Sequence, residues 1–155
     1  MPALRRHRLT EVFLVKLMKY DWASAHELSD VFERGINDEL EDRMDELAGH
    51  PTRCPHGEPI PTANAVMPRV HDAPLSEVET GQEYAISRVN THDADKLAYL
   101  GELGLKPGTR IYLVSRAPFN GPLQLRLKDD IQVIGHELAG VLRVCSPDEF
   151  ELKTK

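Results

Sequence analysis

Six prolines fall between residues 51 and 74 of this 155-residue chain, at positions 51, 55, 59, 61, 68 and 74. Proline fixes φ and removes a backbone donor, so a segment this rich in it does not continue a helix or a central strand. The segment therefore predicts an ordered loop or linker, with regions of different character on either side. A chain of this length has room for one compact domain or two small ones.

The residues before this segment follow the period of an α-helix. Between residues 4 and 20, apolar side chains recur at i, i+3, i+4 and i+7, and neither Gly nor Pro interrupts them. A second helix is expected to begin near Ser24, because Ser24 and Glu27 have the capping-box pattern. A third is expected to start after Asn37, a favourable N-cap residue, and to stop at Gly49.

The residues after the proline-rich segment alternate between apolar and polar over short runs, separated by turns that contain Gly and Pro. One helix, at about 94–103, is expected to interrupt them. Five short strands in about 70 residues suggest a small β-barrel. The expected strands are 84–89, 109–115, 123–128, 131–134 and 141–144.

The expected fold is therefore α+β, with a three-helix unit followed by a small β-barrel. We assign residues 1–50 to the helical domain, 51–74 to the connector, 75–146 to the barrel and 147–155 to a tail. Three short helices bury little surface on their own, so they should pack against another surface, and a partner subunit is the natural candidate. The residues suited to that seam are Leu9, Phe13, Leu40 and Met44.

The composition argues against several classes of function. A net charge of −6 disfavours general affinity for nucleic acid. No apolar run approaches the ~18 residues needed to span a membrane, and the N-terminus makes a poor signal peptide, so we expect a cytoplasmic protein with no membrane partner. The sequence contains no GxSxG, Walker, HExxH or CxxC motif, so we do not expect an enzyme.

Two pairs of residues suggest a metal site. His7 and Glu11 lie four positions apart on a predicted helix, so their side chains share one face and can reach one ion. Cys54 and His56 offer a thiolate and an imidazole from a stiff, proline-rich backbone, which loses less entropy on binding. The alternatives are a His–Glu hydrogen bond on a surface helix, and a buried thiol beside a surface histidine.

Together these four side chains provide two nitrogens, one carboxylate and one sulfur. That set suits Zn²⁺, Fe²⁺, Co²⁺ or Ni²⁺, and it suits Mn²⁺ less because of the sulfur. Asp30 and Glu33 could share a second cation, but the adjacent Arg34 can satisfy a carboxylate without any metal, and that interpretation is at least as favoured. His26, in the cap region of the second helix, is interpreted as structural or solvent-facing.

Several strings are similar to a known family. RHRL at 6–9, AHE at 25–27 and CPHGEPIP at 54–61 resemble the metal-binding and dimerisation domain of the diphtheria-toxin-repressor family, which are iron- and manganese-dependent bacterial transcription regulators. YLGELGLKPGT at 99–109 and APFNGP at 117–122 resemble the SH3-like barrel of the same family. That barrel also occurs alone in ferrous-iron transport accessory proteins.

The resemblance implies a ligand set and a cofactor. In the manganese-responsive branch, one site would correspond to His7, Glu11, Cys54, His56 and Asp93, with Fe²⁺ or Mn²⁺ as the expected ion. Asp93 is otherwise an N-cap, which is the default role of an Asp at a helix start. The family's other site would fall on Asp30, Glu33 and Arg34, and because arginine replaces the family's histidine there, a second metal is less expected.

The resemblance also implies a winged helix-turn-helix ahead of the helix that carries His7, and this sequence begins at that helix. We therefore expect the metal-sensing and dimerisation core of a homodimeric repressor that lacks its own DNA-binding domain. DNA contact would then need the missing N-terminal domain or a full-length partner. The alternative is a stand-alone protein-interaction module of iron homeostasis, which would use its barrel to bind a membrane transporter or another regulator.

Overall fold

The computed structural model describes residues 2–153 and divides them into two compact units. The first unit contains residues 2–70, 92–98 and 152–153, and the second contains 71–91 and 99–151. No helix among the described residues is both long and apolar enough to cross a membrane.

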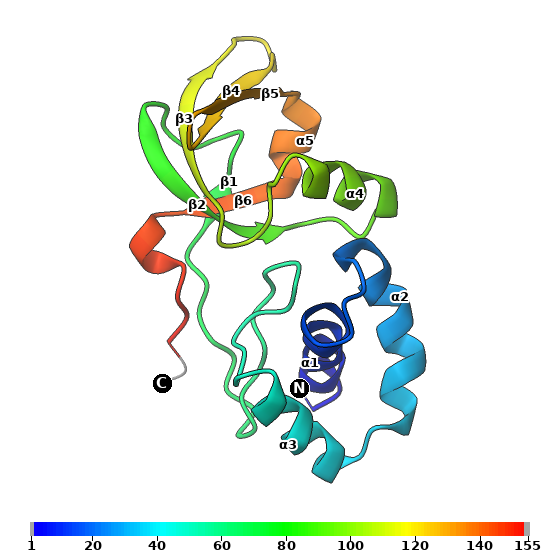
Figure 1. Ribbon diagram of the computed structural model, residues 1–155. Helices are drawn as coiled ribbons and strands as arrows, with labels where there is room; N and C mark the ends of the chain where they lie inside the picture. The colour runs from blue at the N-terminus through cyan, green and yellow to red at the C-terminus, as the bar shows by residue number, and fades with distance from the viewer. Residues whose placement is uncertain (1, 154–155) are drawn as a thin grey trace. The chain divides into compact units, whose positions relative to one another are not determined.

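Three α-helices form most of the first unit, as the periodicity predicts. They are α1 (Pro2–Lys16), α2 (Trp22–Phe32), which continues into the 3-10 turn η1 (Glu33–Gly35), and α3 (Asp38–Leu47). Both α2 and α3 contact α1, which Figure 1 shows end-on between its neighbours. Leu9 of α1 is only 1% exposed, so it belongs to the core of this unit and is not available to a partner.

The starts and ends of these helices follow capping chemistry. Asp21 caps α2 by accepting a hydrogen bond from the Ser24 amide at 2.7 Å, so the prediction that Ser24 is itself the cap is wrong. Asn37 caps α3, as predicted, by accepting from the Leu40 amide at 2.9 Å. Gly49 follows α3 with φ of 81°, a left-handed conformation that glycine adopts without strain and that commonly ends a helix.

The second unit is a six-stranded antiparallel sheet in the order β1-β6-β2-β3-β4-β5. Register shifts in the β2–β6 and β3–β4 pairs bend it, as bulges do in small barrels. The five predicted strands are all present, and the two-residue β1 and the helix α5 are additional. The elements are β1 (Ala73–Pro74), β2 (Gln82–Val89), α4 (Ala94–Glu102), β3 (Arg110–Arg116), β4 (Leu123–Leu127), β5 (Asp130–Ile134), α5 (His136–Val141), β6 (Leu142–Cys145) and η2 (Pro147–Glu149).

A buried carboxylate ties the end of the connector to this sheet. The Asp72 side chain is 1% exposed and accepts hydrogen bonds from Ser87, from two nitrogens of Arg88 and from Arg143, all at 2.7–2.8 Å. Burial raises the pKa of Asp72, but the hydrogen bonds from Arg88 and Arg143 outweigh it and hold the pKa at about 2. These hydrogen bonds fix the end of the connector to β2 and β6.

Candidate metal centre

Glu11 occupies the centre of a buried polar cluster in the first unit. Its position on α1 places it one turn after His7 on the same helix face, as the spacing predicts. Its side chain is 3% exposed, which is rare for a carboxylate that has no compensating partner. The residues that surround it come from α1, from α2 and from the loop that follows α3.

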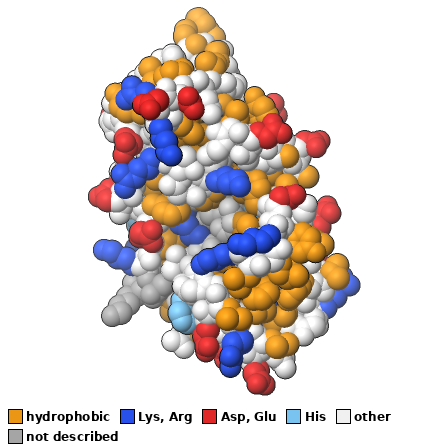
Figure 2. Space-filling model, viewed as in Figure 1, with side chains coloured by type: hydrophobic (Ala, Val, Ile, Leu, Met, Phe, Trp, Pro, Cys, Tyr) orange, Lys and Arg blue, Asp and Glu red, His pale blue; other side chains and the backbone are white. Residues whose placement is uncertain are grey.

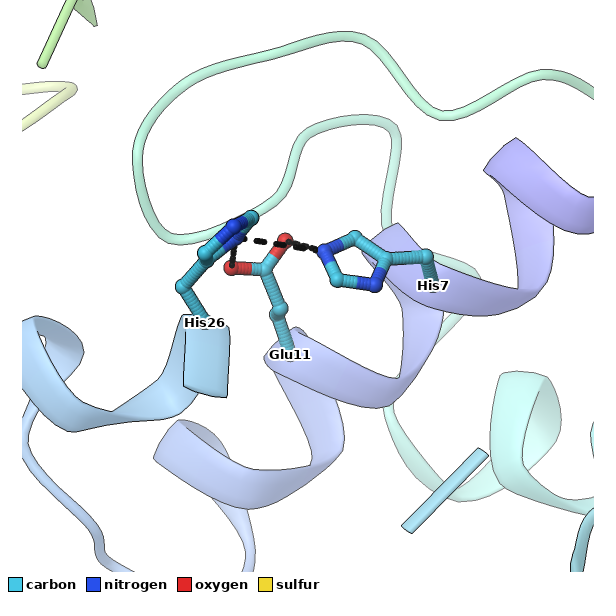
Figure 3. A group of neighbouring side chains, drawn as sticks. All are labelled: His7, Glu11 and His26. Atoms are coloured by element: carbon cyan, nitrogen blue, oxygen red, sulfur yellow. Dashed lines mark hydrogen bonds and ion pairs between the residues drawn. The ribbon is translucent and has the colours of Figure 1, made fainter. Parts of the chain in front are cut away.

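Two histidines approach the Glu11 carboxylate from α1 and α2 (Figure 3). Nε2 of His7 lies 3.4 Å from Oε1 of Glu11, and Nδ1 of His26 lies 3.6 Å from Oε2. The two imidazole nitrogens are themselves 3.3 Å apart. Nitrogen and oxygen atoms of these three side chains all lie within 4.8 Å of one another, which is close enough for a metal ion to join them.

The proline-rich loop supplies a thiol and a third imidazole. The Cys54 amide donates to the Glu58 carbonyl at 2.8 Å, and the Gly57 amide donates to the Cys54 carbonyl at 2.9 Å. Gly57 has φ of 92°, so this turn requires a residue that tolerates the left-handed region. The closed turn directs Cys54 and His56 to Glu11, and the ligand atoms of these three buried residues also lie within 4.8 Å of one another.

The orientation of His56 is fixed by a main-chain acceptor. Its Nε2 donates to the Trp22 carbonyl at 2.8 Å, so its Nδ1 faces the cluster, 3.4 Å from Oε2 of Glu11. The indole of Trp22 also stacks on the imidazole, with ring centroids 5.6 Å apart. A histidine held this way by its second nitrogen is typical of metal ligands, because the hydrogen bond selects the tautomer.

The charges in the cluster depend on one another. Burial lowers the pKa of His56, but interaction with Cys54 and Glu11 raises it to about 10. Burial raises the pKa of Glu11, and the nearby His56 more than compensates, so the Glu11 pKa is lowered. The carboxylate is therefore ionised at neutral pH in spite of its burial.

Asp30 and Glu33 are directed to His7. Oδ1 of Asp30 and Oε2 of Glu33 each lie 3.4 Å from Nδ1 of His7, and the three side chains form a further possible ligand group. Arg34 is exposed in the 3-10 turn that follows α2. The structure thus places His7 beside these two acids.

Two residues behave differently from the sequence-based interpretation. The interpretation of His26 as structural or solvent-facing is wrong, because its ring lies within the cluster. Its spacing from Asp30 and Glu33, at i, i+4 and i+7, was an available signal that all three share one face of α2. Asp93 caps α4, accepting at Oδ1 from the amides of Asp95 and Lys96 at 2.9 and 3.2 Å, and it belongs to none of the three ligand groups among the described residues.

Two family models match this chain. Residues 2–62 match that of the iron dependent repressor, metal binding and dimerisation domain, and residues 73–144 match that of the FeoA domain. The iron-dependent repressor IdeR of Mycobacterium leprae is 25% identical over 158 residues, which cover 91% of this chain and 66% of IdeR. The diphtheria toxin repressor of Corynebacterium diphtheriae is 26% identical over 123 residues, which cover 73% of this chain and 54% of that repressor. The chain therefore spans at most about two thirds of the length of these relatives.

Solved structures of manganese-dependent repressors also match most of the chain. A manganese-dependent transcriptional repressor is 30% identical with a TM-score of 0.86, and the match covers 93% of this chain and 78% of the repressor. A manganese-dependent transcriptional repressor in complex with manganese is 30% identical with a TM-score of 0.84, covering 92% of this chain and 68% of that one. The helical unit and the small barrel thus have the architecture of metal-dependent repressors, and the predicted α+β fold is confirmed. The chain belongs to the family of iron- and manganese-dependent transcriptional repressors, which is not a family of enzymes.

Proposed function

We propose that this chain is the metal-sensing and dimerising core of an iron- or manganese-dependent transcriptional regulator, and that it binds a divalent transition metal at Glu11. The observation that carries the proposal is the burial of that carboxylate among the imidazoles of His7, His26 and His56 and the thiol of Cys54. Burying a neutral polar group without a hydrogen bond costs on the order of 2–7 kcal/mol, and burying a carboxylate costs more. A cation at this point compensates that cost directly.

The donor chemistry fits the ions that the family uses. Imidazole nitrogens and a carboxylate oxygen suit Fe²⁺ and Mn²⁺, and the sulfur of Cys54 extends the range to Zn²⁺, Co²⁺ and Ni²⁺. His7, Glu11, Cys54 and His56 would hold the ion, with His26 as an additional ligand. A bound divalent ion would hold α1, α2 and the loop together through its ligands. It would thereby stabilise the conformation in which these ligands are close to one another.

The other predicted ligands are proposed with separate roles. Asp93 stays a candidate fifth ligand in addition to its observed role as the cap of α4. An Asn at position 93 keeps the cap and removes the charge, so loss of metal affinity in Asp93→Asn would identify a ligand. Asp30 and Glu33 stay candidates for a second ion, and their contacts with Nδ1 of His7 also suit them to orient that ring for the main site.

A homodimer is proposed from an apolar surface of the first unit. Phe13, Phe32, Leu40 and Leu47 line a hollow of about 490 Å³. Leu40 and Leu47 are 47% and 59% exposed, and Figure 2 shows hydrophobic side chains gathered over this region. The first unit matches the family's dimerisation domain, so a second copy of the chain is the occupant that we propose.

The proposal assigns residues 2–153 to metal binding and pairing, with operator recognition outside them, and it implies a cytoplasmic location. The alternative is a protein-interaction module of iron homeostasis. It is favoured by the FeoA match and by the exposure of Ile131 and Val133, at 51% and 63%, on the edge strand β5. A pull-down that recovers a transporter or another regulator would support the alternative, and one that recovers only this chain would contradict it.

Isothermal calorimetry with Mn²⁺, Fe²⁺ and Co²⁺ tests the metal assignment. We expect the double variant His7→Ala/His56→Ala to lose tight binding, whereas His50→Ala/His71→Ala, which changes two histidines outside the three ligand groups, should bind as the unsubstituted chain does. The single tryptophan, Trp22, stacks on His56, so its fluorescence gives a second readout of occupancy. Unchanged affinity and stoichiometry in the first variant would contradict the proposal.

A further inference from the structure

The strand β5 forms one edge of the sheet and has none of the features that usually protect such an edge. The opposite edge, β1, is only two residues long and ends in Pro74. Proteins commonly protect an edge strand with lysine, proline or a bulge. The sequence of β5, DIQVI, contains neither lysine nor proline, and its pairing with β4 has no register shift. It is therefore a regular edge that a further strand can extend.

Ile131 and Val133 direct both their side chains and their main chain away from the protein. Their side chains are 51% and 63% exposed. The turn that joins β4 to β5 has two residues, 128–129, so the residues that flank it share main-chain hydrogen bonds. Such pairs alternate along a hairpin, so the N–H and C=O groups of Ile131 and Val133 turn away from β4 and lie on the free edge.

We propose that β5 pairs antiparallel with β5 of a second copy of this chain, about a two-fold axis at Gln132, so that the two sheets become continuous. This inference goes beyond the proposed function, because it places a second interface in the barrel, distinct from the apolar hollow of the first unit. An interface of this kind uses the same surface on both copies, so β5 must be complementary to itself.

The register about Gln132 satisfies that requirement. Ile131 then lies opposite Val133 of the second copy, and the same pair forms again by symmetry. The two pairs make about four main-chain hydrogen bonds between outward-facing groups, and each brings two exposed aliphatic side chains together. Moving the axis to Ile131 or to Val133 would instead place Val133 opposite Asp129, or Ile131 opposite Gly135. Only the axis at Gln132 pairs both apolar residues.

The charges at the two ends of β5 also favour the antiparallel direction. Lys128 precedes the strand and Glu137 follows it, and both are exposed. Antiparallel pairing places the start of one strand beside the end of the other, so Lys128 approaches Glu137 of the second copy twice. Asp129 and Asp130 both lie at the start of the strand. A parallel arrangement would bring these acids together, whereas the antiparallel one separates them.

The length of β5 indicates a weak contact that is strengthened by a second one. Five residues from each copy are far fewer than the roughly 20–30 a side of a stable interface. When the first units of two chains also pair, the contact at β5 forms at a high effective concentration and adds to the overall affinity. Two different two-fold contacts on one chain join dimers into tetramers or longer arrays.

Sedimentation velocity of the full chain over a range of concentrations tests the inference in the Leu40→Lys background, which removes the proposed contact of the first units. We expect dimers at high concentration in this background. Adding Ile131→Lys should weaken the association at least tenfold, because lysine on an edge opposes strand pairing. Val66→Lys, at a residue of the connector that is 46% exposed, is the matched control and should leave the association unchanged.

Oppositely charged variants in the same background test the register. Ile131→Lys mixed with Val133→Glu should form mixed dimers, because the lysine lies opposite the glutamate of the other copy. Ile131→Lys mixed with Ile131→Glu is the control, since these two positions do not lie opposite each other, and it should form at least tenfold fewer. Native mass spectrometry identifies the mixed dimers by mass. Equal amounts in the two mixtures would overturn the proposed pairing.

The results also separate this inference from the proposed function. Dimers that dissociate in Leu40→Lys at every concentration, and that Ile131→Lys alone does not affect, would overturn the pairing of β5 and leave the proposed function intact. Dimers that dissociate in Ile131→Lys alone would support the pairing of β5 and overturn the interface proposed for the first unit. An unsubstituted chain that is monomeric at every concentration would overturn both contacts.

Discussion

The imidazole of His92 stacks on that of His26, with ring centroids 4.1 Å apart and ring planes at 11°. Burial, and then the nearby His26 and His56, lower the pKa of His92, so this ring is neutral at physiological pH. His92 precedes α4, in a stretch of chain that returns from β2 to the first unit. The stacking therefore makes this stretch part of the surroundings of the candidate metal centre.

His92→Ala is expected to weaken Mn²⁺ binding by about tenfold, because His26 loses the ring that orients it, and groups that orient a ligand typically contribute tenfold or more. His92→Phe should keep most of the affinity, since phenylalanine preserves the stacked ring without a nitrogen. Calorimetry on both variants distinguishes a role of His92 in stacking on His26 from a role as a metal ligand. An equal loss in both would mean that a nitrogen of His92 is needed, as in a ligand.

Arg34→His is expected to increase the number of metal ions bound per chain. The substitution removes a permanent positive charge beside Glu33 and adds an imidazole one helical turn after Asp30. The count measured by native mass spectrometry should rise relative to the unsubstituted chain, and Arg34→Gln is the control because it removes the charge without adding a ligand. No increase in the count would indicate that Asp30 and Glu33 serve only to position His7.

Asp72 should make the stability of the barrel depend on acid pH. Its folded pKa is about 2, below the ordinary value of 3.8, so its contribution is complete above about pH 4 and is lost as the pH falls toward 2. A shift of this size corresponds to about 2 kcal/mol. Urea unfolding followed by circular dichroism should show that loss between pH 4 and pH 2.

Asp72→Asn should lower the free energy of unfolding by about 2–3 kcal/mol at pH 7 and flatten this acid dependence, since the buried ion pairs with Arg88 and Arg143 are broken. Glu83→Gln is the matched control. Its ion pair with Arg110 is exposed, so we expect a change below about 0.5 kcal/mol. Equal effects of the two substitutions would contradict a structural role for the Asp72 cluster.

Leu40→Lys is expected to convert the proposed homodimer to monomer, because it places a charge in the apolar hollow lined by α1 and α3. Leu40 is 47% exposed, so the fold of the chain itself should be unaffected. Val31→Lys, at a residue that is 67% exposed and does not line the hollow, should leave the dimer intact. Sedimentation velocity distinguishes these results, and dimers of unchanged affinity in Leu40→Lys would place the interface elsewhere.

Periodic elements were predictable from the sequence, and short ones were not. The helices α1 and α3 and five strands follow from hydrophobic spacing, because each is long enough to show a period. Lys16, the polar residue within the apolar face of α1, donates to the Ala48 carbonyl at 2.8 Å, a contact that no local pattern reveals. The strand β1 and the helix α5 have too few residues to carry a periodic signal.

The cluster around Glu11 was predictable in part for the same physical reason. His7 and Glu11 share a helix face, and Cys54 and His56 share a short turn, so local spacing brings each pair together. His26 depends on how α1 and α2 pack, which spacing within one helix does not determine. The partners of Asp72 lie on strands that are distant in sequence, so the ion-pair cluster follows only from the pairing of β2 with β6.

The position of residues 92–98 limits where the chain can be cut into two separate domains. Residues 92–98 lie inside the stretch that matches the FeoA domain, yet they belong to the first unit. There Leu97 is fully buried, and its carbonyl accepts a hydrogen bond from the Trp22 indole at 3.1 Å. A recombinant that exchanged residues 73–144 with a relative would therefore also replace seven residues of the first unit, including the ring that stacks on His26. An exchange of the barrel alone would therefore have to keep residues 92–98 of this chain.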